Sequence, residues 1–346
     1  MTGDPLAGRL AARTLELIDI PSESRGEDAL AAHVTGVLQQ GGVKVQGLGD
    51  TCVLAGPPEA KVLLAGHLDT VPTQGNRPGA SDSARVHGLG ASDMKGALAV
   101  MVELALDHAP FRCLFFGREE LPVADSALGP LLARELEAVR ADLVLMMEPT
   151  DNQIHAGCLG NINATWTFRG RSGHSARPWD ADNAITKAAA GISALTAHPP
   201  DVHEFNGLTF TEVASVTTIA GGIARNVIPD ETSCGLNFRY APGRAPDAAV
   251  QRLHELVGDH GEITIDSNAP SGRVPAGNDL LGSLISHGEL AVLPKQAWTP
   301  VAEFATAGLD AVNFGPGAPS QAHRRDESIE ISALVACYEL LRSWMA

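Results

Sequence analysis

The feature that most constrains this 346-residue chain is an apolar run that ends abruptly in polar residues, at positions 61–72. The run begins with consecutive aliphatic residues, which is typical of a strand covered by helices on both faces of a sheet. His67 and Asp69 follow, and alternate residues of an extended chain point the same way. Both side chains can therefore face one site at the carboxyl end of a strand, where open α/β sheets bind ligands. Asp69 could bind a metal there or orient His67, but a solvated polar strand end is the alternative.

The order of the other patterns indicates an α/β domain into which a second domain is inserted. Over residues 1–160, strand patterns alternate with helical patterns, which indicates a mainly parallel sheet flanked by helices. Strands in 161–274 instead alternate apolar and polar residues, in the β-α-β-β-α-β order of a ferredoxin-like unit. Patterns of the first kind resume over 275–346, so we predict that this segment completes the first domain. Within the insert, the strand containing Trp166 and Phe168 could be an edge that pairs with a second subunit.

Composition excludes several kinds of partner and of metal ligand. The net charge of −16 argues against nucleic acids and anionic membranes. No apolar window reaches the length of a membrane-spanning helix, and the first residues lack the layout of a signal peptide, so we expect a cytoplasmic protein. The five cysteines are scattered and form no Cys-x-x-Cys pair, which indicates reduced thiols. Any metal must therefore be bound through nitrogen and oxygen.

Four further polar sites fall where strands of the predicted sheet should end. Asp93 is bracketed by glycines just before a helix, where a simple helix cap is the alternative. Glu119 and Glu120 are adjacent and cannot point the same way, so one could bind a metal while the other acts as a base; a solvated acidic turn is the alternative. Glu148 ends an apolar strand and needs water or a cation there. His323 follows a glycine-rich loop, and a structural role is its alternative.

Together these side chains form a ligand set suited to two adjacent divalent ions. Two-metal hydrolases need a bridging carboxylate, terminal ligands for each ion and a free general base. The candidate ligands are all nitrogen or oxygen atoms, which zinc binds, and cobalt or manganese could replace zinc with the same ligands.

The whole chain resembles the co-catalytic zinc family of aminoacylases and carboxypeptidases, which includes desuccinylases, acetylornithine deacetylase and carboxypeptidase G. The resemblance is carried by the runs 66–72 and 90–96 and by the pair at 119–120. It implies an amidohydrolase with two metal ions and the following roles: His67 and Glu148 bind one ion, Glu120 and His323 bind the other, Asp93 bridges them, Asp69 orients His67, and Glu119 is the general base.

The inserted domain contains one more catalytic candidate, His174, within the run 173–178. In the family, the matching histidine reaches across a dimer interface into the partner's site. The resemblance therefore implies a homodimer in which His174 donates a hydrogen bond to the oxyanion of the reaction. An ordinary position in a surface loop is the alternative.

Three stretches, 224–229, 237–239 and 313–317, resemble the substrate-recognition stretches of the family's succinyl-diaminopimelate desuccinylases. This resemblance implies removal of the succinyl group from N-succinyl-LL-2,6-diaminopimelate in lysine biosynthesis, giving succinate and LL-diaminopimelate. That substrate carries three carboxylates, and arginine suits bidentate binding of carboxylates. The candidate substrate contacts are Arg177, Arg225, Asn226, Arg239, Gly315 and Gly317.

Two alternatives remain open on the sequence. The run around His174 is also compatible with acetylornithine deacetylase or a related N-acyl amino acid deacylase or dipeptidase. In a different class, the chain could be a non-catalytic relative that binds a metabolite through the same cleft. For the arginines, the alternative is that some of them merely pair with neighbouring acidic residues.

Overall fold

The computed structural model describes residues 4–346, which form two compact units. Unit 1 contains the described residues up to Ala156, together with Pro275–Leu293 and Glu303–Ala346, and unit 2 contains Gly157–Val274 and Pro294–Ala302. The sequence-based boundary placed all residues after 274 in the first domain. Residues 294–302 instead belong to unit 2, where the indole nitrogen of Trp298 donates to the carbonyl of Pro270 at 3.1 Å.

Unit 1 is built on an eight-stranded sheet with the order β1-β2-β6-β3-β7-β17-β8-β16. The four central strands, β6, β3, β7 and β17, run parallel, whereas β2 and β8 flank them antiparallel. All residues of β3, β6 and β7 are buried, because helices cover both faces of the sheet. The strand bounds are β1 Val45–Gly49, β2 Cys52–Ala55, β3 Val62–His67, β6 Phe111–Phe116, β7 Leu143–Met146, β8 Ile154–Ala156, β16 Val292–Pro294 and β17 Ala311–Asn313.

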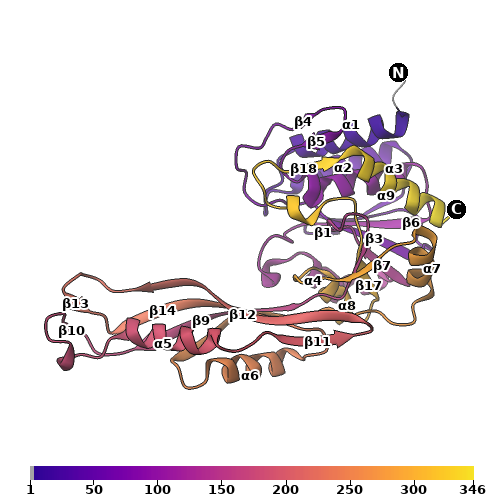
Figure 1. The fold of residues 1–346 in the computed structure, drawn as a ribbon. Helices are drawn as coiled ribbons and strands as arrows, with labels where there is room; N and C mark the ends of the chain where they lie inside the picture. Colours follow the sequence, from indigo (N-terminus) through magenta and orange to yellow (C-terminus); the bar gives the residue numbers. More distant parts are fainter. Residues whose placement is uncertain (1–3) are drawn as a thin grey trace. The chain divides into compact units, whose positions relative to one another are not determined.

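The most buried helix of unit 1 is α3, which packs on β3 and β6 and is apolar around its whole circumference. Helices α1, α2 and α9 surround it, and α4 lies on the other side of the sheet (Figure 1). The helix bounds are α1 Pro5–Asp19, α2 Asp28–Gln40, α3 Gly96–Leu106, α4 Leu128–Val139, α7 Asp279–Gly288 and α9 Ile331–Trp344, and α8 Val301–Thr306 begins in unit 2 and ends in unit 1. No helix in the part of the chain that the structure describes is long and apolar enough to cross a membrane.

A small three-stranded sheet in unit 1 joins two distant parts of the chain. Its order is β18-β5-β4, with the bounds Ser328–Glu330, Arg85–His87 and Ala80–Ser81. The segment before the C-terminal helix is thereby fixed to the segment that leads into α3.

Unit 2 is an antiparallel sheet with the order β11-β12-β14-β9-β15, covered on one face by α5 and α6. The strands β12-β14-β9-β15 and the two helices form the β-α-β-β-α-β arrangement that the sequence predicted. The additional strand β11 was not predicted. The bounds are β9 Gly160–Arg169, α5 Ala184–Thr196, β11 Asp201–Phe205, β12 Leu208–Gly221, β14 Glu231–Tyr240, α6 Pro246–Val257 and β15 Glu262–Ala269.

The hypothesis that the Trp166 and Phe168 strand is a sheet edge is wrong. That strand, β9, lies between β14 and β15, and both aromatic rings are buried in the core beneath the helices. The alternation of apolar and polar residues indicates which face of the strand is buried. It does not indicate whether the strand lies at the edge or in the middle of the sheet. β11 pairs only with residues 208–212 of β12, so residues 213–221 have a paired neighbour on one side only, among the strands described.

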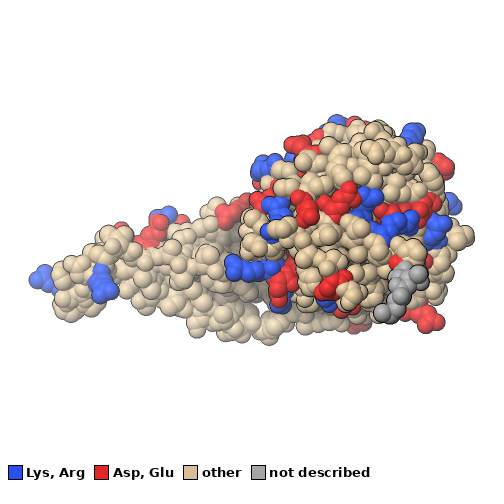
Figure 2. All heavy atoms as spheres, turned by 90° about the horizontal axis from the view of Figure 1, so that it is seen from above, with Lys and Arg blue, Asp and Glu red and all other residues tan. Residues whose placement is uncertain are grey.

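The surface of unit 1 carries mixed charges. On the face shown in Figure 2, acidic and basic side chains are interspersed. Several of the arginines form ion pairs, such as Arg9 with Asp107 at 2.7 Å and Arg85 with Glu330 at 2.8 Å. Surface pairs of this kind contribute little stability, but they leave few basic groups of unit 1 available to an anionic ligand.

Candidate metal centre

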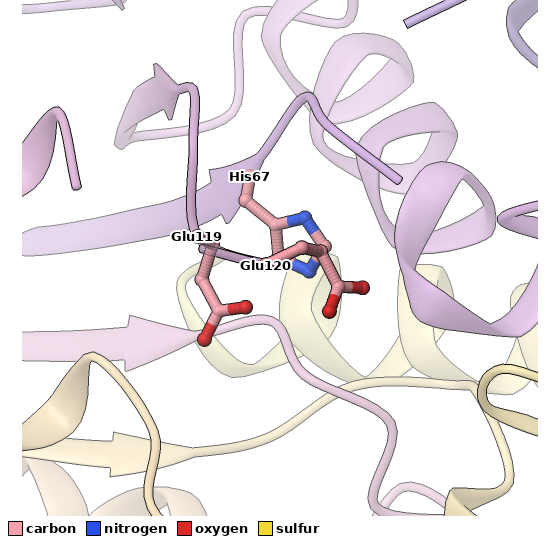
Figure 3. A group of neighbouring side chains, drawn as sticks. All are labelled: His67, Glu119 and Glu120. Carbon is pink, nitrogen blue, oxygen red and sulfur yellow. The ribbon is translucent and has the colours of Figure 1, made fainter. Parts of the chain in front are cut away.

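The ends of neighbouring strands bring the predicted site residues of unit 1 together. β3 ends at His67, and the loops after β6 and β7 carry the Glu119–Glu120 pair and Glu148. Because these strands are parallel, their carboxyl ends meet at one edge of the sheet. Figure 3 shows the imidazole of His67 projecting from β3, with the carboxylates of Glu119 and Glu120 directed to different sides of it. The adjacent glutamates therefore face different surroundings.

Two groups of potential metal ligands share Asp93. In the first group, Nε2 of His67 lies 3.1 Å from Oδ1 of Asp93 and 3.8 Å from Oε1 of Glu148. In the second group, Nε2 of His323 lies 3.1 Å from Oε1 of Glu120 and 3.6 Å from Oδ2 of Asp93. Within each group the ligand atoms lie within 4.8 Å of one another. Each oxygen of Asp93 thus faces a different group, which is the arrangement a bridging carboxylate requires.

A tight loop directs Asp93 into the site. Gly90 has φ +80°, and a Cβ atom there would come within 3.0 Å of the Thr70 side chain, so this position requires glycine. The turn η1 (Ala91–Lys95) follows, and α3 begins only at Gly96, with Lys95 at its N-cap. Asp93 therefore does not cap α3, which removes the simple alternative for this residue.

Asp69 supports the site through two different groups. Its backbone carbonyl lies 2.9 Å from Nδ1 of His67, whereas its carboxylate oxygen is 3.7 Å from the same nitrogen. The carboxylate instead accepts the backbone N–H groups of Glu119 at 2.9 Å and Glu120 at 3.0 Å, and the hydroxyl of Ser24 at 2.8 Å. The ring is therefore oriented by the carbonyl, and the carboxylate fixes the loop that carries the two glutamates.

Two buried glutamates that the sequence analysis missed hold the same loops. Glu27 accepts the backbone N–H of Arg118 at 3.0 Å, directly before the Glu119–Glu120 pair. Glu327 accepts three backbone N–H groups from the loop that carries Asp93. Both residues are only 2% exposed. Neither ends a strand pattern, so no local signal separates them from ordinary surface glutamates; the one hint for Glu327 is its position four residues after His323.

The crowding of acidic groups shifts the pKa values of the site. Burial raises the pKa of the Glu119 carboxyl well above its ordinary value, and the negative charge of Glu148 adds to the shift. The hydrogen bond with Glu120 raises the pKa of His323 to about 9. Burial opposes charge on His67, but Asp93 and Glu119 outweigh it and raise the pKa of His67. Divalent cations would reverse this balance, because they favour ionised carboxylates and neutral imidazoles.

A further group of acidic residues and a histidine, Asp201, His203 and Glu212, lies in unit 2. Glu212 already accepts two hydrogen bonds from Arg244, at 2.7 and 2.9 Å, and one from the N–H of Ala241 at 2.9 Å. Arg252 lies 3.8 Å from Asp201, so each acidic residue of this group faces an arginine and the group is an ion-pair network.

The predicted substrate contacts are divided between the two units. Gly315 and Gly317 follow β17 in unit 1, where a Cβ atom at either position would lie 2.4 Å from a backbone oxygen, of Met147 and Ser92 respectively. Their lack of a side chain is therefore required for packing of this loop against the loops that carry Glu148 and Asp93.

The candidates of unit 2 lie in two places. Four of them gather around the two-stranded antiparallel sheet of β10 (Gly173–His174) and β13 (Val227–Ile228), where the N–H of Ser175 donates to the carbonyl of Asn226 at 3.0 Å; they are His174, Arg177, Arg225 and Asn226. Arg239 lies on β14, and its Nε donates to the side-chain oxygen of Asn237 at 2.9 Å. No ion pair with a carboxylate is formed by Arg177, Arg225 or Arg239 among the described residues.

Comparisons with known proteins agree with this architecture. Residues 157–264 match the family model of the peptidase dimerisation domain. The chain is 37% identical to a putative succinyl-diaminopimelate desuccinylase of Mycobacterium tuberculosis, over 100% of this chain and 99% of that protein. It is 32% identical to the succinyl-diaminopimelate desuccinylase of Corynebacterium glutamicum, over 100% of this chain and 97% of that protein. An M20 family metallo-carboxypeptidase from Sulfolobus solfataricus has the same fold, with a TM-score of 0.77, 18% identity, and 99% and 98% of the two chains covered.

We expect Glu119→Gln to raise the unfolding temperature of the metal-free protein at about pH 8. The pKa of Glu119 is raised in the folded state, so the folded state binds this proton more tightly than the unfolded state does. Stability is then lost as the pH rises above the ordinary glutamate pKa, and removing the charge restores it. Calorimetry in the presence of chelator should show a smaller gain at about pH 5, because less of this stability has been lost at the lower pH.

The matched control for this measurement is Glu103→Gln. Glu103 is a buried glutamate of α3 whose charge is already paired with Arg9 at 3.1 Å and Arg13 at 2.9 Å. We expect this control to destabilise the protein at both pH values, because it leaves buried partners unmatched. A Glu119→Gln variant that is destabilised at both pH values would contradict the conclusion that burial and neighbouring negative charges raise the pKa of Glu119.

Proposed function

Because this chain belongs to the family of succinyl-diaminopimelate desuccinylases, we propose that it hydrolyses N-succinyl-LL-2,6-diaminopimelate to succinate and LL-diaminopimelate. The observation that carries the proposal is the pair of ligand groups that share Asp93, with Glu119 beside them. A relative that only binds a metabolite would not need the carboxylate of Glu119 next to a complete set of metal ligands. The site therefore favours an enzyme.

The donor set fits two divalent ions, since nitrogen and carboxylate oxygen ligands converge in two groups. In this proposal His67 and Glu148 would hold one ion, Glu120 and His323 would hold the other, and Asp93 would be their shared ligand. Zinc is the proposed metal, with cobalt or manganese as substitutes. When bound, such ions lower the pKa of a water molecule and polarise the scissile carbonyl group.

Glu119 is the proposed general base. It takes a proton from the attacking water and later delivers that proton to the leaving amine nitrogen. Its place among the acidic groups supports this role, because burial and the charge of Glu148 raise the pKa of its carboxyl and so favour its accepting a proton. The water oxygen first forms the new C–O bond of succinate, and the amide C–N bond then breaks as the amine leaves with the proton from Glu119, so no oxidant or further reactant is needed.

Recognition of the carboxylates of the substrate falls, in this proposal, to Arg177, Arg225 and Arg239, with Asn226. All three arginines lack a carboxylate partner within the described residues. The interaction of Nε with Asn237 fixes Arg239 and leaves its terminal nitrogens to bind an anion. The loop with Gly315 and Gly317 would line the substrate on the side of the metal ligands.

His174 is the proposed oxyanion donor, supplied by one protomer of a homodimer to the site of its partner. The match of residues 157–264 to a dimerisation domain supports the dimer. The N–H of Ala176 donates to Nδ1 of His174 at 3.0 Å, so the neutral ring carries its proton on Nε2. Because His174 is exposed, this Nε2–H is available to a negatively charged oxygen.

We expect Glu119→Ala to lower kcat roughly 10²- to 10⁴-fold while two ions per chain are retained. The reason is that the proposed ligands are all left in place when the base is removed. Metal analysis by mass spectrometry, together with steady-state kinetics, checks both parts. Turnover equal to that of the wild type would exclude Glu119 as the base.

The substrate assignment is tested by comparing N-succinyl-LL-2,6-diaminopimelate with N-acetylornithine and with small dipeptides. We expect kcat/KM for the succinyl compound to exceed that for either rival by about tenfold or more, which corresponds to about 1.4 kcal/mol of discrimination. A preference of that size for N-acetylornithine or a dipeptide would replace the assigned substrate and leave the amidohydrolase assignment in place.

Two inactive variants, His174→Ala and Glu119→Ala, test the role of His174 when they are combined. In a mixed dimer, the protomer with intact Glu119 receives His174 from its partner, so one site is complete. Random mixing of subunits should restore roughly a quarter of the wild-type activity. No restoration in purified mixed dimers would show that His174 does not act across the interface.

A further inference from the structure

We infer that Glu327 is a positioning residue that fixes the bridging Asp93 in register with His323. The inference rests on the proposed metal centre and goes beyond it, because Glu327 is neither a metal ligand nor a substrate contact in that proposal.

The carboxylate of Glu327 accepts backbone N–H groups from one loop only. Its Oε1 accepts from Ser92 and Asp93, and its Oε2 accepts from Gly90, each at 2.9 Å. These donors span the four residues that end at the bridging carboxylate. With both oxygens of Glu327 engaged, the loop cannot shift Asp93 without breaking a charge-assisted hydrogen bond.

The backbone around Glu327 ties this loop to His323. The carbonyl of Glu327 accepts the N–H of Gly88 at 3.0 Å, and β18, which follows directly, pairs with β5. On the other side, the N–H of Glu327 donates to the carbonyl of Arg324 at 3.3 Å. His323 itself has φ +62°, in the left-handed region that a non-glycine residue keeps only where its surroundings hold it. Glu327 is thus the point at which the loops of two ligands are joined.

Two other buried glutamates of the chain are held differently. Glu103 and Glu212 are matched by arginine side chains. Glu327 has no lysine or arginine within ion-pair distance among residues 4–346. A buried carboxylate costs free energy unless hydrogen bonds compensate it, and here every compensating bond comes from the ligand loop. The role of this charge is therefore local to the metal centre.

The two ions should not depend on Glu327 equally. His67 and Glu148 are set by the ends of β3 and β7, which the central sheet holds. Asp93, Glu120 and His323 form the group in which two ligands lie on the segments that Glu327 joins. Loss of Glu327 should therefore weaken the ion of this second group first.

Metal titration of three purified variants tests the inference. Glu327→Ala removes all three acceptor contacts, whereas Glu327→Gln keeps an acceptor oxygen for Ser92 and Asp93 and sets an amide N–H₂ against the N–H of Gly90. We expect Glu327→Ala to bind the more weakly held ion roughly 10- to 100-fold less tightly, with Glu327→Gln between it and the wild type. The control, Glu103→Gln, should lower the unfolding temperature and leave both affinities unchanged.

The readouts are zinc affinity in competition with a chromophoric chelator, and the visible absorbance of the cobalt-loaded protein, which reports the geometry of the bound ions. Retention of about one ion by Glu327→Ala, at concentrations where the wild type holds two, supports the inference. Affinities and cobalt spectra that change no more than those of Glu103→Gln overturn it and leave the proposed function standing. A wild-type protein that binds no divalent ion at all would overturn the proposed function itself. If Glu327→Ala does not fold, Glu327→Gln decides by the same measures.

Discussion

Mutual repulsion of carboxylates at the edge of one sheet is the constraint on which the rest of unit 1 depends. Asp69, Asp93, Glu119, Glu120 and Glu148 converge around His67 in a region that is largely closed to water. Like charges at such separations interact strongly where the dielectric constant is low. The fold compensates them with backbone N–H groups directed at carboxylate oxygens, and the proposed cations would supply the rest.

The carboxylates around this site are of two kinds. Asp69, Glu27 and Glu327 have their oxygens engaged by backbone N–H groups and hold loops in place. Asp93 and Glu120 instead direct oxygens at the histidines and at the space between them. The first kind can be placed precisely in the absence of metal, because amide dipoles are part of the folded backbone. A site prepared in this way needs little rearrangement on binding ions, which favours both affinity and correct geometry.

The sequence could predict those features that depend on residues close together in the chain. An apolar run that stops at His67, and others that stop before Glu119 and Glu148, locate the strand ends, and the parallel order brings those ends together. Glu327 could not be found in this way, because its burial arises only when β18 pairs with β5, more than two hundred residues apart. The position of a strand within its sheet also depends on distant parts of the chain. For this reason the strand that contains Trp166 was wrongly expected at a sheet edge, and β11 was missed.

The strongly acidic composition also determines where an anionic ligand can be recognised. A chain with net charge −16 repels a polycarboxylate at long range, so binding has to come from cations placed at short range. In unit 1, basic side chains such as Arg9 and Arg85 are paired with acidic neighbours. Arg177, Arg225 and Arg239 of unit 2 are not, and Figure 2 shows basic side chains at the end of unit 2 that carries β10 and β13. In the proposed function, the metal ligands and these three arginines therefore lie on separate units, so that substitutions at the arginines can change substrate binding without replacing a metal ligand.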